Sequence, residues 1–170
     1  MDYLFKELTS KKIGEIAVIG PPDSAQEPFI HSICKDVSTS YQDIIFGRLD
    51  FARELSLFVY GIRPNDGILE FSWDLIAQKI LGFIILFDWY DEQSFENSKK
   101  FLDFLSQQFD APILLAADVR ERPYPANRNI FQDGISLDIH RKLTFCSSSD
   151  PRSSKKVFIS LINSVINKLP

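Results

Sequence analysis

The segment from Gly20 to Glu27 has the position and the length of a phosphate-binding loop. It follows the apolar run IGEIAVI and leads into EPFIHSICKD, a stretch with helical periodicity. Loops of the pattern G-x-x-x-x-G-K-[ST] lie between a strand and a helix, where backbone amides and a lysine hold phosphates and a hydroxyl holds magnesium. With Gly20 as the first glycine, the spacing predicts the position of a phosphate site.

The residue types at this position do not suit phosphate. Ala25 replaces the second glycine, Gln26 replaces the lysine and Glu27 replaces the hydroxyl. Asp23 adds a second carboxylate, and both carboxylates would lie close to a negatively charged triphosphate. Two like charges about 4 Å apart repel by roughly 4 kcal/mol at an effective dielectric of 20. We interpret the loop as a degenerate site, with weak nucleotide binding and an ordinary strand-to-helix turn as the alternatives. The degenerate phosphate loop comprises Gly20, Asp23, Ser24, Ala25, Gln26 and Glu27.

Apolar runs alternate with helically periodic segments along the whole chain. Strands are expected at 13–19, 43–51, 55–61, 80–88, 111–118 and 142–146, and helices at 27–36, 68–79, 92–109, 130–137 and 151–169. The turn near 52–54 predicts an antiparallel hairpin, and Asp150 is expected to cap the last helix. This order predicts an α/β three-layer domain whose six-stranded, mostly parallel sheet has one antiparallel edge strand and about five helices.

Composition limits the classes of function. The formal net charge of −4 argues against a nucleic-acid binder, because such proteins need basic residues against phosphates. No apolar run reaches the roughly 18 residues of a membrane span, so a cytoplasmic protein is expected. Residues 1–12 are expected to form an N-terminal arm and residues 13–170 one domain. The two cysteines do not suggest a metal site or a disulfide.

The element order and several local stretches resemble the Ras-like small GTPases, most closely the prokaryotic MglA-like kind. These stretches are IAVIGPPDSAQEPFIHSI, FGRL, VYG, SWD, ILGFIILFD and PILLAAD. The resemblance spans 13–169 and implies a P-loop NTPase fold. Members of that family bind a guanine nucleotide, but the changed loop predicts no cofactor here, with weak guanine-nucleotide binding as the alternative. It also removes the expectation of GTPase activity and of a bound metal.

The resemblance assigns base-reading equivalents as well. The N-K-x-D motif of the family falls on 118–121, where Asp118 cannot donate a hydrogen bond as asparagine would. Glu121 keeps an acceptor for a guanine edge. The last nucleotide-contacting motif of the family falls on Cys146, Ser147 and Ser148.

Aromatic and basic residues also follow the expected strands. Trp89 and Tyr90 come directly after the central strand, at the edge where ligands bind in such sheets, and are either interface or core-edge aromatics. Arg63, Arg120 or Arg122 could compensate for the missing lysine from another direction.

A protein that keeps the surface of a small GTPase but loses its nucleotide would act by binding other proteins. The hypothesis is therefore a catalytically inactive, GTPase-like subunit of a signalling or regulatory complex. Its expected partner is a Roadblock/longin-domain protein or an intact small GTPase. The alternative is an atypical GTP-binding protein or NTPase with altered loop ligands and weak or slow hydrolysis. The partner-binding candidates are Tyr41, Phe46, Tyr60, Arg63, Asn65 and Trp73.

Overall fold

The computed structural model describes residues 12–21, 24–39, 44–63, 79–124, 135–136, 138 and 141–168. The strands are β1 (Lys12–Ile19), β2 (Lys35–Thr39), β3 (Ile45–Ala52), β4 (Leu55–Ile62), β5 (Ile80–Asp88), β6 (Ile113–Asp118), β7 (Ile135–Ser136) and β8 (Arg141–Cys146). The helices within these ranges are α2 (Gln26–Ile33), α3 (Glu92–Gln108) and α4 (Pro151–Lys168).

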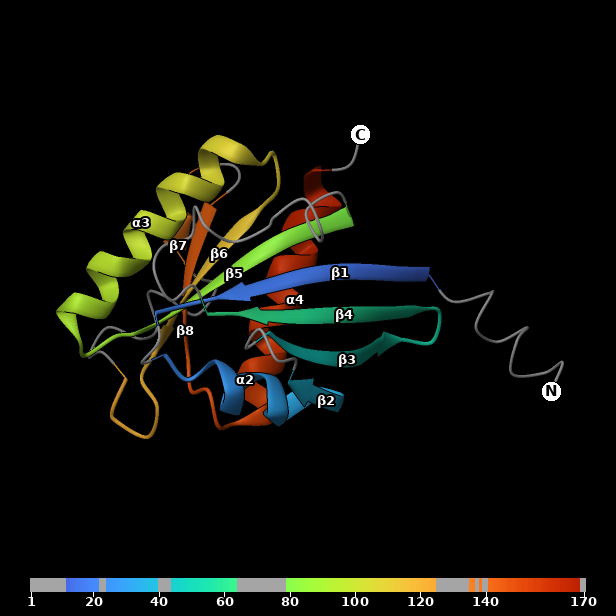
Figure 1. Ribbon diagram of the computed structural model, residues 1–170, viewed down its shortest axis with the longest axis horizontal. Helices are drawn as coiled ribbons and strands as arrows, with labels where there is room; N and C mark the ends of the chain where they lie inside the picture. Colours follow the sequence, from blue (N-terminus) through green and yellow to red (C-terminus); the bar gives the residue numbers. More distant parts are fainter. Residues whose placement is uncertain are drawn as a thin grey trace, which may run out of the picture.

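The strands form one sheet in the order β2-β3-β4-β1-β5-β6-β8-β7 (Figure 1). The five central strands β4, β1, β5, β6 and β8 are parallel to one another. The predicted hairpin of β3 and β4 is antiparallel, as expected. The prediction of six strands with one antiparallel edge strand is wrong, because the described residues form eight strands, of which β3 and β7 run antiparallel to the five central strands. Strand β2 lies at one edge and pairs antiparallel with β3.

Helices cover both faces of the sheet, which confirms the mixed α/β class. On one face α2 and α4 pack together, with Phe29 stacked on Phe158 at 5.4 Å between ring centroids. On the other face α3 packs on β5, where Phe95 contacts Phe87 at 5.4 Å. The apolar run of β5 is buried almost throughout because helices cover it from both sides.

The first helix is shorter than predicted. It ends at Ile33, because Cys34 adopts extended backbone angles and the following residues pair with β3 as strand β2. The prediction of a helix over 27–36 is therefore wrong at its C-terminal end. In β2 the pairing register shifts between Lys35 and Ser38, and Asp36 there has a φ of 53°. Arg48 of β3 forms an ion pair with Asp36 at 3.2 Å.

Other predictions have mixed outcomes. The helix expected at 130–137 is wrong at Ile135–Ser136, which pair with β8 as strand β7. The helix expected at 68–79 falls, apart from its last residue, outside the described residues. The helix-capping prediction is confirmed, since the amide of Arg152 donates to Asp150 Oδ1 at 3.0 Å. Within the described residues, no helix has the length and apolar character to cross a membrane.

Candidate functional site

The described residues of the predicted nucleotide site gather at one edge of the sheet. Because the five central strands are parallel, their carboxyl ends and the loops that follow lie along the same edge. One end of this edge, at β1 and β4, carries the degenerate phosphate loop. The other end, at β5, β6 and β8, carries the base-reading equivalents. We describe these as the loop end and the acidic end.

Gln26 ties two strands together at the loop end. As the first residue of α2, its side chain is fully buried. Its Nε2 donates to the carbonyl of Val18 at 3.1 Å and to the carbonyl of Ile62 at 2.8 Å. The amide therefore joins β1 to β4 where a lysine would be needed for phosphate.

The loop itself packs against its own backbone. A Cβ added to Gly20 would lie 2.4 Å from Ser24 Oγ and 2.5 Å from the carbonyl oxygen of Leu86, so Ser24 covers this glycine closely. The amide of Ser24 donates to the carbonyl of Pro21 at 2.9 Å. Ala25 is the N-cap of α2 and supplies no side-chain capping bond. Asp23 lies outside the described residues.

Glu27, at the position of the magnesium-binding hydroxyl, lies beside two basic side chains. Arg63 at the end of β4 donates to Glu27 Oε2 at 3.3 Å. His31 Nε2 lies 3.8 Å from Glu27 Oε1, one turn along α2. Among the described residues no group of three potential metal ligands comes together. Glu27 is thus paired with Arg63 within the protein.

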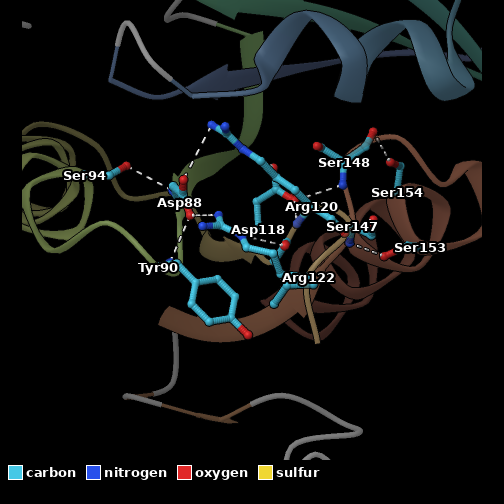
Figure 2. Close-up of polar contacts among 11 residues, drawn as sticks. Asp88, Tyr90, Ser94, Asp118, Arg120, Arg122, Ser147, Ser148, Ser153 and Ser154 are labelled. Carbon is cyan, nitrogen blue, oxygen red and sulfur yellow. Dashed lines mark hydrogen bonds and ion pairs between the residues drawn. The ribbon is translucent and has the colours of Figure 1, made fainter. Parts of the chain in front are cut away.

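At the acidic end, Asp118 joins two loops (Figure 2). Its side chain is only 1% exposed, and its Oδ1 accepts hydrogen bonds from the amides of Arg120 at 2.8 Å and Ser148 at 3.0 Å. Arg120 adopts a φ of 56°, in the left-handed region of backbone conformation. Ser147 Oγ donates to the carbonyl of Arg120, and the Ser147 amide donates to Ser153 Oγ. The chain segments after β6 and β8 are therefore held together by Asp118 and Ser147.

Asp88, at the end of β5, forms a second charged centre that the sequence did not single out. Arg122 donates to its Oδ1, which also accepts the amide of Tyr90 at 2.9 Å. Arg120 lies 3.7 Å from Asp88 Oδ2. In the sheet Asp88 is the direct register partner of Asp118. That two neighbouring parallel strands both end in aspartate was the signal available in the sequence.

Of the two aromatic residues after β5, Tyr90 packs onto this charged centre (Figure 2). The guanidinium of Arg122 lies 4.3 Å from the centroid of the Tyr90 ring, and the Tyr90 hydroxyl donates to the carbonyl of Pro123. Trp89 meets Phe145 edge-on at 4.8 Å. Trp89 and Tyr90 remain 39% and 47% exposed, so they are surface aromatics at the edge of the core.

The remaining base-reading equivalents are divided between core and solvent. Cys146 is fully buried, and burial, together with the nearby charge of Asp118, raises the pKa of its thiol well above the usual value. Ser148 is 3% exposed. Glu121 is exposed, while Val119, where the family has a lysine, is buried in the core.

The structure separates the predicted partner-binding residues. Phe46 of β3 and Tyr60 of β4 pack together at 5.5 Å between ring centroids, and the Tyr60 hydroxyl donates to Glu15 at 3.3 Å. Burial first, and then the charge and hydrogen bond of Glu15, raise the pKa of Tyr60. Arg63 lies instead with Glu27 at the loop end. Three further candidates lie outside the described residues: Tyr41, Asn65 and Trp73.

The described residues do not fit a guanine nucleotide with magnesium. The position of the phosphate-binding lysine carries a neutral amide whose donors are already used, and the position of the magnesium ligand carries a carboxylate paired with arginine. No protein-family model matches the sequence, and a search of curated proteins finds no match.

Proposed function

We propose that this protein is a catalytically inactive, small-GTPase-like (pseudo-GTPase) subunit that works by binding other proteins. The partner we propose is a Roadblock/longin-domain protein or an intact small GTPase, within a signalling or regulatory complex. The strand order supports the proposal, since a β3-β4 hairpin leading into a parallel β4-β1-β5-β6-β8 sheet has the layout expected from the sequence resemblance.

The observation that carries the proposal is the position of Gln26. A fully buried amide that donates to two main-chain carbonyls is a structural contact, and breaking it to admit phosphate would remove one hydrogen bond from each of these carbonyls. A lysine at the same place would carry a charge available to an anion. The side chain therefore favours a loop that stabilises the sheet over one that binds nucleotide.

The charges of the acidic end point in the same direction. Asp118 accepts two backbone amides of its own chain, and Asp88 accepts Arg122. These contacts use groups that a bound base would have to reach. The resulting edge is built from internal ion pairs and hydrogen bonds, although the buried Asp118 Oδ2 accepts no hydrogen bond within the described residues.

If the protein acts by binding other proteins, the β3-β4 hairpin is the first surface to test. Phe46 and Tyr60 lie on neighbouring strands near one edge of the sheet and form, with Phe58, a half-buried aromatic cluster. Aromatic residues are enriched at protein interfaces because they bury a large area with few rotatable bonds. We expect Phe46→Ala to weaken partner binding more than it lowers stability.

Nucleotide analysis of the purified protein tests the inactive assignment. The protein is denatured, its supernatant is analysed for nucleotide, and a thermal melt is followed with GTP and magnesium. We expect no bound nucleotide and no change in Tm. A co-purified guanine nucleotide, or a rise of several degrees at sub-millimolar GTP, would overturn the proposal.

Restoring the pattern residues provides a stricter version of this test. The double variant Gln26→Lys/Glu27→Thr regains the lysine and the hydroxyl. We expect it to unfold at a lower Tm than the parent chain and to remain without GTP binding, because it loses the bonds to Val18 and Ile62 and the pair with Arg63. Tight GTP binding by this variant would indicate that the rest of the pocket is intact.

A further inference from the structure

The outer face of α4 has a charge that sets it apart from the rest of the molecule. The helix contains four basic residues and no acidic residue, in a chain whose formal net charge is −4. Lys168, in its last turn, pairs with Asp110 at 2.7 Å. The other three are exposed near the start of the helix, and none of the ion pairs among the described residues includes them: Arg152, Lys155 and Lys156.

Helix stability does not explain these cations. The N-terminal end of a helix carries a partial positive charge, which favours acidic residues there and basic residues at the other end. Arg152 lies in the first turn, and Lys155 and Lys156 follow in the second. With no acid on the helix, intrahelical ion pairs cannot compensate. Conflicts between local stability and sequence of this kind concentrate at functional sites.

Exposed apolar residues continue the same face along the helix. Ile159 is 38% exposed and Ile166 is 56% exposed, and they are two of only a few large apolar side chains exposed among the described residues. The spacing from Lys155 to Ile159 and on to Ile166 is i, i+4 and i+11, so the three lie on one side of the helix. The opposite side, with Phe158 and Leu161, is buried against the sheet and α2. In Figure 1 α4, in red, lies behind the sheet on the side of α2, away from α3.

We propose that this face, defined by Arg152, Lys155, Lys156, Ile159 and Ile166, is a docking surface for a partner protein that presents carboxylates beside an apolar centre. Charge complementarity selects this partner, because three basic residues that form no ion pair with the described part of the chain lie next to two exposed isoleucines, and together they match acidic and apolar groups. Two isoleucines are too small an apolar area for membrane insertion, and the acidic chain as a whole repels nucleic acid. The inference rests on the proposed function and adds to it a second surface, separate from the β3-β4 hairpin.

The test uses a synthetic peptide in which Glu and Leu repeat in the pattern of an amphipathic helix. A peptide with Gln in place of Glu is its uncharged control. Binding to the full chain is measured at low salt by isothermal titration and by chemical-shift changes of α4. We expect the Glu/Leu peptide to bind to α4 and the Gln/Leu peptide to bind far more weakly.

The variant is Lys155→Glu/Lys156→Glu. Its matched control is Lys99→Glu/Lys100→Glu, which makes the same charge change at an exposed lysine pair on α3. Reversal on α4 should weaken peptide binding about tenfold or more, because each reversed charge replaces an attraction with a repulsion. Reversal on α3 should leave the affinity within about twofold. The α4 variant should also keep or raise its Tm, since acids suit that end of the helix better.

Several results would overturn the proposal. They are equal loss of peptide binding in both variants, a lower Tm of the α4 variant, and binding of phosphatidylserine vesicles or single-stranded RNA in preference to the peptide. A dimer in sedimentation velocity that dissociates on reversal of Lys155 and Lys156 would assign the face to a second copy. Peptide binding does not depend on nucleotide, so its failure is distinct from a failure of the inactive assignment.

Discussion

The two ends of the sheet edge use different side-chain contacts to join neighbouring strands and loops. At the loop end a single neutral, fully buried amide, that of Gln26, joins β1 to β4. At the acidic end, buried carboxylates are held by backbone amides and by arginines whose side chains are 42% exposed. The first arrangement depends on hydrogen bonds alone, whereas the second combines hydrogen bonds with charges that solvent can reach.

This difference predicts different responses to salt and to mutation. Hydrogen bonds of a buried amide are insensitive to ionic strength, while partly exposed ion pairs weaken as salt screens them. Removing a buried carboxylate, or the donor that pairs with it, should lower the free energy of unfolding the most. The partner left behind is then desolvated and unpaired. Three experiments examine this contrast, and a fourth tests a pH effect at Cys34, which belongs to neither end.

The largest effect is expected for Asp118→Ala. The substitution leaves the buried amides of Arg120 and Ser148 without their acceptor and should lower the free energy of unfolding by about 2–4 kcal/mol. Asp118→Asn, which keeps Oδ1, is the control and should cost at least about 1 kcal/mol less. Denaturant unfolding measures both, and equal losses would show that the charge of Asp118, and not its acceptor, stabilises the two loops.

Gln26→Ala should have the next largest effect. Loss of the donor to Val18 and Ile62 should cost about 1–3 kcal/mol, by the same amount at low and high salt. Gln26→Met, which keeps most of the side-chain volume, separates packing from hydrogen bonding. If Gln26→Met is as stable as the parent chain, the amide does not hold the strands together.

Arg122→Ala should give a smaller and salt-dependent loss. Its pair with Asp88 is partly exposed, so we expect about 1 kcal/mol at low salt and less at high salt. Arg152→Ala, at an exposed arginine that is in none of the ion pairs of the described residues, is the matched control and should show no such loss. A loss for Arg122→Ala that is independent of salt would instead point to its packing on Tyr90.

The effect expected to be smallest at neutral pH is a pH dependence caused by Cys34, which appears only in the alkaline range. Burial raises the pKa of its thiol from the usual 9.0 to about 12 in the folded protein. The unfolded chain therefore releases this proton first, and stability falls as pH rises above about 9, by at most about 1.4 kcal/mol per unit. Cys34→Ser should flatten the alkaline limb of stability against pH. The same slope in this variant would assign the effect to another group.

The sequence predicted the strands of the sheet well because their apolar runs are distinctive. The run of β5 has the predicted bounds, Ile80–Asp88, and β1 and β4 differ from theirs by one residue at an end. The missed strands have weak patterns of their own. KDVST of β2 is largely polar and depends on pairing with β3, and β7 has two residues. Helical periodicity before Lys35 could not indicate that the chain would pair with a neighbouring strand.

The site was predictable in position but not in its contacts. The spacing from Gly20 placed Gln26 and Glu27 at the start of a helix, where the structure has them. It could not show that the Gln26 amide faces the carbonyl of Ile62, because that bond spans 36 residues. Nor could it show that Arg122 reaches Asp88 rather than a ligand. These contacts depend on how loops cross the sheet edge, which no local pattern records.

The irregular strand β2 affects whether the sheet of one molecule can pair with the sheet of another. A straight outer strand offers a row of free amides and carbonyls on which another chain can extend the sheet. In β2 the register shift between Lys35 and Ser38, with Asp36 turned to a positive φ and paired with Arg48, interrupts that row. The outer boundary of the sheet therefore resists edge-to-edge aggregation at high protein concentration.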